Sequence, residues 1–199
     1  MIPNSIDVEQ FRPMEAPQIP NRILYYGSII RKKGVLELAK ICNFIFEQNP
    51  DARLILAGND VNDVFTGRST QELFMESVRP EFRKHIKFKG LLAYEGVQEE
   101  IAKAAVIVLP SFAEALPMTW IEAMAMEKAL VTSDIGWANE VMRDGETGYT
   151  VDPKNHKYYA DAVLKLLDSK DLRSQMGGNA RKRVIEKFAT AIVVKQNLD

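Results

Sequence analysis

Short runs of apolar residues alternate with amphipathic stretches along most of the chain. The runs RILYYG and ARLILAG are almost wholly apolar and end in glycine, which is typical of strands buried on both faces of a sheet. The stretch between them places Val35, Leu38, Cys42 and Ile45 at helical spacing. Strands that alternate with helices predict βαβ units, and therefore a doubly wound, Rossmann-like α/β domain with a parallel sheet of about six strands flanked by helices.

The same pattern places the remaining elements. Strands are expected at residues 22–27, 52–58, 85–90, 105–111, 128–134 and 149–152. Helices are expected at residues 34–50, 94–104, 139–148, 156–169 and 171–188, with another that begins at Pro117. Gly177-Gly178 is expected to interrupt the helix at 171–188, and the polar stretch 60–82 is expected to be partly helical.

The chain is expected to divide into three parts. Residues 1–21 contain four prolines and show no helical or strand period, so they predict an extended linker. Residues 22–188 carry the α/β pattern and predict a single ligand-binding domain. Residues 189–199 form a separate, partly apolar C-terminal helix.

Composition and charge exclude several classes of function. The formal net charge of 199 residues is -1, so no global field draws the chain to nucleic acid. Cys42 is the single cysteine, which excludes an intrachain disulfide and a cysteine metal cluster and fits a reducing, cytoplasmic compartment. His85 and His156 lie far apart in the sequence, and no apolar run reaches the length of a membrane span.

Glycine ends three of the predicted strands, at Gly27, Gly58 and Gly90. In an open parallel sheet, ligands bind beyond the carboxyl ends of the strands. A glycine there lets a ligand approach the backbone closely, or it only permits a tight turn. The sequence leaves both interpretations open.

The stretch SFAEALPMTWIEAMAM holds two acids without an obvious basic partner, Glu114 and Glu122. Pro117 suits the first helical position, which leaves the amides of Met118 and Thr119 free to meet a phosphate or water. Glu122 then either lies on an exposed stripe or is buried and accepts bonds from ribose hydroxyls. Glu114 is either a first-turn acid favoured by the helix dipole or an acceptor for sugar hydroxyls.

The first strand is followed by a turn with three cations, SIIRKKG. G-x-G-x-x-G, the P-loop pattern and Asp-x-Asp are all absent from the sequence, so a dinucleotide oxidoreductase and a metal-held diphosphate lose support. The lysines are either solvated loop residues or cations that pair with a diphosphate. In the second case Lys33, Arg31 and the helix start neutralise charge that grows on a leaving phosphate, without a metal ion.

Taken together, these pieces resemble the donor-nucleotide domain of a group-1 retaining glycosyltransferase, which is one half of the two-domain GT-B fold. IPNSIDVEQFRP is similar to the interdomain segment of that family, GSIIRKKG to its Gly-Arg-x5-Gly loop, and EALPMTWIEAMAM to its Glu-x7-Glu motif. SDIGWANEVMRDGETGYTVDP resembles the block that ends in Gly-x-x-Gly. The resemblance runs over nearly the whole chain.

The resemblance implies a role for each matching residue. Lys33 would contact the diphosphate of a UDP-, GDP- or ADP-sugar, Glu114 the transferred sugar and Glu122 the ribose, with Lys33 and Glu114 as the catalytic pair. The main chain at Gly90-Leu91 would contact the base. The full expected donor-binding set is Gly27, Ser28, Arg31, Lys33, Gly58, Gly90, Leu91, Glu114, Leu116, Pro117, Met118, Thr119 and Glu122, with no metal ligand and no cofactor.

The sequence departs from the family pattern at one site position, because Ser28 stands where an arginine often follows the first glycine; Arg31 is the candidate substitute. The resemblance also implies that an N-terminal domain, which this chain lacks, binds a glycan or lipid-linked acceptor, and that residues 189–199 cross to it. Such an enzyme is compatible with peripheral association at the inner face of a membrane.

Four functions compete at this stage: a hexosyltransferase donor domain, a nucleotide-sugar-binding module without turnover, half of a nucleotide-sugar epimerase, and a receiver-like signalling domain. The Glu-x7-Glu spacing disfavours the epimerase. The absence of an acidic pair after RILYY disfavours the signalling domain.

Overall fold

The computed structural model describes residues 5–114, 117–136 and 138–198. Its strands are β1 (Arg22–Tyr26), β2 (Arg53–Ala57), β3 (Ile86–Gly90), β4 (Val106–Leu109), β5 (Leu130–Thr132) and β6 (Tyr149–Thr150). Its α-helices are α1 (Val35–Gln48), α2 (Thr70–Ser77), α3 (Tyr94–Lys103), α4 (Met118–Ala125), α5 (Ala138–Val141), α6 (His156–Asp168), α7 (Lys170–Lys187) and α8 (Thr190–Leu198). Two 3-10 helices, η1 (Arg31–Lys33) and η2 (Pro80–His85), complete the order, so residues 60–82 are partly helical as expected.

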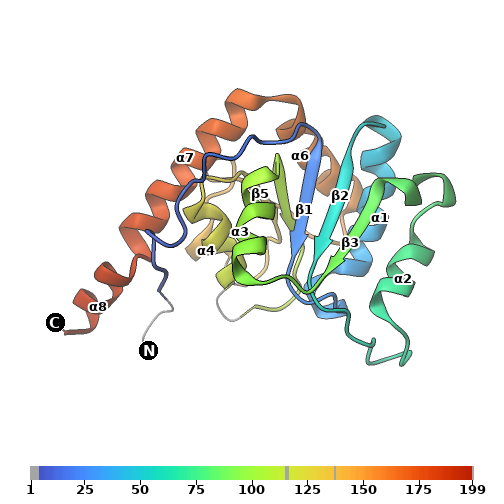
Figure 1. The fold of residues 1–199 in the computed structure, drawn as a ribbon, viewed down its shortest axis with the longest axis horizontal. Coiled ribbons are helices and arrows are strands. Elements are labelled where there is room, and N and C mark those ends of the chain that lie inside the picture. Colours follow the sequence, from blue (N-terminus) through green and yellow to red (C-terminus); the bar gives the residue numbers. More distant parts are fainter. Residues whose placement is uncertain (1–4, 115–116, 137, 199) are drawn as a thin grey trace.

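The six strands form one parallel sheet in the order β3-β2-β1-β4-β5-β6. The order reverses between β1 and β4, which are neighbours although α1, α2, α3 and two strands separate them in the sequence. This is the switch point at which open α/β sheets bind ligands. The carboxyl ends of the strands lie at the lower edge of the sheet in Figure 1. The predicted fold class is confirmed.

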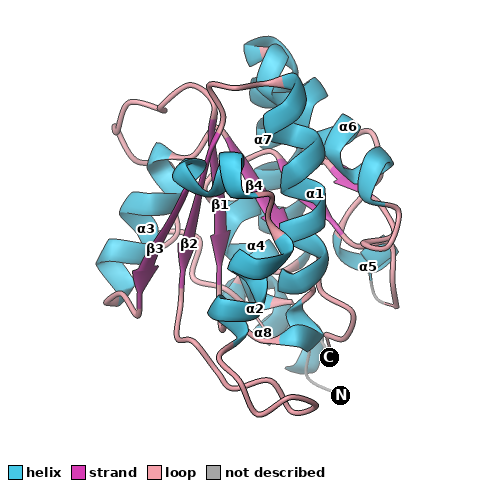
Figure 2. Cartoon of the chain, turned by 90° about the vertical axis from the view of Figure 1, so that its right-hand side faces the viewer, coloured by secondary structure: helices cyan, strands magenta, loops and turns pink. Residues whose placement is uncertain are grey.

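The strands are buried because helices cover both faces of the sheet. All four residues of β4 are buried, as are the last four of β1 and of β2. Helix α1 packs against α2 and α6 on one face, whereas α4 packs against α7. Figure 2 shows α3 on one side of the sheet and α1 and α6 on the other. Near-continuous apolar strands are the consequence of this two-sided burial.

Helix α7 is continuous from Lys170 to Lys187, so the expected interruption at Gly177-Gly178 is wrong. A Cβ atom at Gly177 would lie 2.1 Å from the carbonyl oxygen of Glu127, at the turn after α4. Gly178 has nothing within 4 Å of the corresponding position. The first glycine therefore serves the close approach of α7 to the α4–β5 turn and does not break the helix.

The amino-terminal segment, residues 5–21, contains no regular helix or strand, as expected, but it is docked on the domain. The side chains of Ile6 and Phe11 are buried in the hydrophobic core. The amide of Ile6 donates to the carbonyl of Phe188 at 2.9 Å, and the amide of Thr190 returns a bond to Ile6. Figure 1 shows the segment passing from the side of α7 and α8 over the amino ends of the strands into β1.

Helix α8 follows α7 at the side where the amino-terminal segment begins (Figure 1). In the part of the chain that the structure describes, none of the helices combines the length and the apolar character needed to cross a membrane. The division into linker, domain and crossing helix remains a prediction.

Candidate functional site

The side chains of Lys33 and Glu114 meet at the carboxyl edge of the sheet. Lys33 ends η1, which follows β1, and Glu114 lies in the loop that follows β4. The ammonium group of Lys33 donates to Oε1 of Glu114, which also accepts a hydrogen bond of 2.8 Å from the hydroxyl of Ser111. The pairing of β1 with β4 brings them together across 81 positions, so Glu114 has the basic partner that the local sequence does not show.

The backbone holds the Lys33 loop against the loop after β4. The amide of Phe112 donates to the carbonyl of Lys32 at 2.9 Å. Gly34 has a φ of 72°, and a Cβ there would lie 1.8 Å from the carbonyl oxygen of Pro110. Because only glycine fits so close to Pro110, the loop of Lys33 packs directly against the loop after β4.

Glu122 is half-buried and lies in the same region. Burial raises the pKa of its carboxyl, and the neighbouring phenol of Tyr26, whose hydroxyl donates to the carbonyl of Thr119, partly opposes that shift. Among the described residues, no cation lies within ion-pair distance of Glu122. Glu122 is therefore a partly desolvated carboxylate and does not lie on a fully exposed stripe.

Helix α4 begins one residue later than expected. Pro117 lies at the N-cap and not, as expected, at the first helical position; its carbonyl accepts from the amide of Trp120 at 3.0 Å. Within the described part of the chain, the amides of Met118 and Thr119 have no acceptor. A helix start of this kind, without a side-chain cap, suits a phosphate group.

The three strand-end glycines form a backbone ladder across β1, β2 and β3. The amide of Gly27 donates to Ala57, and the amide of Gly58 donates to Gly90 at 2.8 Å. A Cβ at Gly58 would lie 1.9 Å from the carbonyl oxygen of Gly27, so packing requires this glycine. No protein atom lies within 4 Å of a Cβ at Gly90, whose φ is 66°. Close backbone packing therefore accounts for Gly58 and a left-handed turn for Gly90, and the space beside Gly90 is open.

Two hollows lie at this edge of the sheet. The Glu114 hollow, of about 130 Å³, is lined by Phe112, Ala113, Glu114, Pro117, Trp120, Ile135, Gly136 and Ala138. The Glu122 hollow, of about 310 Å³, is lined by Tyr26, Gly27, Ser28, Ala57, Gly58, Asn59, Leu91, Leu92, Tyr94, Val97 and Glu122. A small recess lined by Lys33, Glu114, Thr119 and Tyr26 shares Glu114 with the first hollow and Tyr26 with the second. Together they form an elongated site with two acids and one lysine.

The guanidinium of Arg31, which was expected to meet a diphosphate, is paired with an acid in the loop after β2. The guanidinium donates two hydrogen bonds, of 2.6 and 2.9 Å, to the carboxylate of Asp63, and it lies over the ring of Phe65. The side chain of Asp63 is buried, and the bonds from Arg31 and Thr66 hold the pKa of its carboxyl well below the usual range. Because this pairing uses the fork of Arg31, the structure favours a structural role for it.

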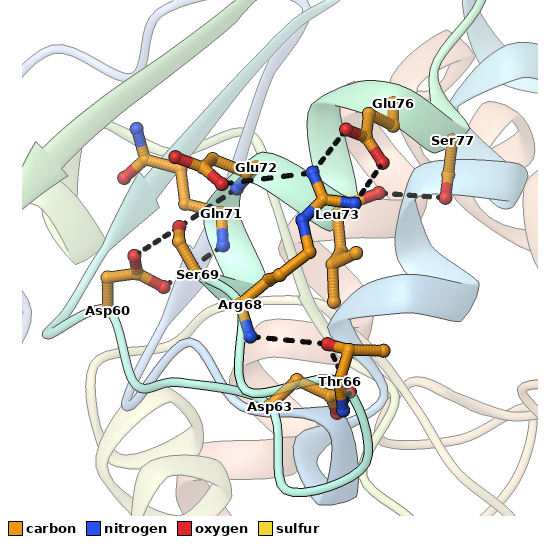
Figure 3. A network of polar contacts seen from close by, with 10 residues as sticks. All are labelled: Asp60, Asp63, Thr66, Arg68, Ser69, Gln71, Glu72, Leu73, Glu76 and Ser77. Atoms are coloured by element: carbon orange, nitrogen blue, oxygen red, sulfur yellow. Dashed lines mark hydrogen bonds and ion pairs between the residues drawn. The ribbon is translucent and has the colours of Figure 1, made fainter.

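The loop that carries Asp63 is itself held by polar contacts, which Figure 3 shows. The carboxylate of Asp60 accepts from the hydroxyl of Ser69 and from the amide of Gln71, at 2.6 and 3.0 Å. Arg68 pairs with Glu76 on α2 (Figure 3). The Arg31–Asp63 pair thus anchors η1 to this loop. The two residues are 32 positions apart, and the hydrophobic pattern of the sequence does not predict the contact.

Of the expected site residues, Leu116 lies outside the described residues. The sequence did not indicate Tyr26, Tyr94 or Asn59, which line the Glu122 hollow. Tyr26 and Asn59 each occupy or follow a strand end, and that position is the signal that could have identified them. No group of three or more metal-ligating side chains occurs among the described residues.

Comparison with known proteins identifies the family to which the chain belongs. Residues 7–183 match the model of the family described as "Glycosyl transferases group 1". The alpha-D-kanosaminyltransferase of Streptomyces kanamyceticus is 30% identical over 158 residues, which is 79% of this chain and 39% of that protein. The chain spans roughly 39–55% of the curated relatives it matches.

Two solved structures show the same fold. The sucrose-phosphate synthase of Thermosynechococcus elongatus superposes with a TM-score of 0.82 at 25% identity, over 99% of this chain and 50% of that one. Alr3699/HepE of Anabaena, solved in complex with UDP and glucose, superposes with a TM-score of 0.82 at 18% identity, over 99% of this chain and 55% of that one.

Proposed function

Because this chain belongs to the group 1 glycosyl transferases, we propose that it binds a nucleotide-diphosphate sugar and presents it for hexosyl transfer, with retention, in the longer protein. The observation that carries the proposal is the convergence of Lys33, Glu114, Glu122 and the start of α4 on one stretch of the carboxyl edge. The solved relative Alr3699/HepE, which holds UDP and glucose on the same fold, supports it.

Each part of the site suits one part of such a donor. The Glu122 hollow suits the nucleoside, with the carboxylate of Glu122 accepting bonds from ribose hydroxyls. The start of α4 and the ammonium of Lys33 suit the diphosphate. The Glu114 hollow suits the sugar, whose hydroxyls would donate to Glu114. The order along the site, nucleoside then diphosphate then sugar, is the order of these groups in the donor.

The reaction breaks the bond between the anomeric carbon and the diphosphate oxygen, so negative charge grows on the leaving diphosphate. A donor group aimed at that charge contributes roughly 2.7–4 kcal/mol to lowering the barrier. Lys33 and the amides of Met118 and Thr119 would supply this stabilisation, and the proposal assigns it to them without a metal ion. The acceptor, a glycan or a lipid-linked sugar, would bind to a further domain, in an enzyme that works in the cytoplasm at the inner face of a membrane.

A binding module without turnover is the second candidate. Both candidate functions require binding of the nucleotide sugar, but only the first includes transfer of the sugar to an acceptor.

A panel of UDP, GDP, ADP and their sugars, added to the chain in EDTA, tests donor binding by thermal shift. One nucleotide should raise the melting temperature, and no shift at millimolar concentration would refute donor binding. A transfer assay with labelled donor then compares this chain with a protein that carries the further domain. Sugar transfer by the longer protein with an unchanged anomeric configuration supports the glycosyltransferase. Donor binding without sugar transfer by either protein supports the binding module.

A further inference from the structure

The Glu122 hollow has an aromatic wall that none of the motifs accounts for. Tyr94 is the first residue of α3, and the residue is 43% exposed. It lines the hollow together with Leu91, Leu92 and Val97, and the glycines that follow β1 and β2 line it as well. An open hollow with an aromatic side and aliphatic neighbours suits a flat, uncharged ring system.

The charges around this hollow assign it to the nucleoside and not to the phosphates. Among its described lining residues there is no lysine or arginine, whereas Lys33 lies in the adjoining recess. Burial and the carboxylates of Glu122 and Asp7 raise the pKa of the Tyr94 phenol, which places its hydroxyl within the field of Glu122. If Glu122 binds the ribose, the ring of Tyr94 lies close enough to contact the base or the ribose.

The ring of Tyr94 is held in place from outside the α/β domain. The ring of Phe11, in the amino-terminal segment, meets it edge to face at a centroid distance of 5.1 Å and an interplanar angle of 81°. The side chain of Phe11 is 4% exposed and belongs to the hydrophobic core. The side chain of Gln98, one turn further along α3, donates to the carbonyl of Gln10 at 2.9 Å. Residues 10 and 11 therefore fasten the first turns of α3.

We propose that the ring of Tyr94 stacks against the nucleoside of the donor and that Phe11 is a positioning residue which holds that ring. The inference rests on the proposed function and deepens it, because it gives the amino-terminal segment a part in nucleotide affinity. Any displacement of residues 10–11 would alter the wall of the Glu122 hollow. A segment expected to serve as a linker would then couple its own position to donor binding.

Calorimetric titration of the chain with UDP, GDP, ADP and inorganic pyrophosphate tests the stacking. Tyr94→Ala should raise the dissociation constant of the preferred nucleoside diphosphate roughly 5- to 100-fold, the range for losing one base–aromatic stack. Pyrophosphate binding should stay unchanged. Tyr94→Phe should stay within about threefold of the unaltered chain, since it keeps the ring. Tyr158→Ala, at a 66% exposed tyrosine on α6, is the matched control.

The outcomes separate this inference from the proposed function. If no diphosphate binds the unaltered chain, the proposed function fails and the inference with it. If a diphosphate binds and Tyr94→Ala leaves its affinity unchanged, only the stacking is overturned. Equal losses in Tyr94→Phe and Tyr94→Ala would also overturn it, because the hydroxyl and not the ring would then carry the contact.

The role of Phe11 has its own test. Phe11→Leu keeps most of the buried apolar volume, and it should weaken nucleoside diphosphate binding several-fold without changing pyrophosphate binding. In the Tyr94→Ala background the same substitution should have no further effect, because the ring on which it acts is gone. Equal effects in both backgrounds would show that Phe11 acts only on overall stability and would overturn the positioning role.

Discussion

Lys33 and Glu114 form an ion pair across the switch point of the sheet, with Lys33 after β1 and Glu114 after β4. In this structure the ammonium of Lys33 and the carboxylate of Glu114 bind each other. A donor with its diphosphate near Lys33 and its sugar near Glu114 would replace this ion pair with one contact to the diphosphate and one to the sugar. The pair also neutralises both charges, which lowers the cost of desolvating them.

Lys33→Met should weaken binding of the preferred nucleoside diphosphate roughly 10- to 100-fold, the range for a lost hydrogen bond to a charged group. The loss arises because methionine keeps the stem of the side chain without the ammonium. Isothermal titration in EDTA measures it. Lys32→Met is the matched control, because Lys32 is the exposed neighbour in η1. Equal losses of affinity in both variants would show that the overall positive charge of the loop, and not a direct contact of Lys33, supports binding.

Glu114→Gln should separate recognition of the sugar from recognition of the diphosphate. The substitution weakens the internal partner of the Lys33 ammonium, so a nucleoside diphosphate should bind at least as tightly as to the unaltered chain. The corresponding nucleotide sugar should lose affinity relative to that diphosphate, since a carboxylate acceptor is lost. Paired titrations give the ratio of the two dissociation constants, and an unchanged ratio would remove Glu114 from the sugar site.

Glu122 should make stability depend on pH in a defined direction. Its folded-state pKa is raised above 4.5 by burial, so between these two values the folded chain binds more protons than the unfolded chain. The free energy of unfolding therefore falls as pH rises through this window. The Glu122→Gln variant lacks this ionisable group and therefore does not lose stability in this way. Its melting temperature should rise relative to that of the unaltered chain as pH increases from 4.5.

Melting curves between pH 4 and 8 measure this difference. A difference that stays constant over the range, or that shrinks as pH rises, would contradict a buried Glu122. The same variant should bind the nucleoside diphosphate more weakly at neutral pH, because an amide nitrogen replaces one acceptor for the ribose hydroxyls.

Gly177 and Gly178 should respond in opposite ways to alanine. Gly178→Ala adds a methyl group to open space in a helix and should stabilise the chain by roughly 0.5–1 kcal/mol. Gly177→Ala should destabilise it by about 1–3 kcal/mol, because the methyl group would collide with the backbone carbonyl of Glu127. Urea unfolding of both variants measures the two changes, and stabilisation by Gly177→Ala would contradict the close packing of α7.

Much of the fold could be predicted from the sequence, because two-sided burial leaves runs such as RILYY and VIVL almost wholly apolar. The error at Gly177 has a physical cause. A helix tolerates the intrinsic cost of glycine where a neighbouring backbone fills the space of a side chain, and the sequence around Gly177 does not show the approach of Glu127.

The site could be predicted only in part. The resemblance pointed to Lys33, Glu114 and Glu122, and the structure brings them to one edge. It did not show that Asp63 takes the guanidinium of Arg31, because such a pair depends on how two loops fold back on each other. The contact between Phe11 and Tyr94 was hidden for the same reason, since it joins the amino-terminal segment to α3.

The central claim is that one nucleotide sugar occupies the carboxyl edge of the sheet, and mapping of amide chemical shifts in the nitrogen-15-labelled chain tests it most directly. A nucleoside diphosphate titrated in EDTA should shift most strongly the amides of Gly27, Ser28, Met118, Thr119 and Glu122. Largest shifts at the opposite edge of the sheet, around Phe46 and His85, would contradict the account.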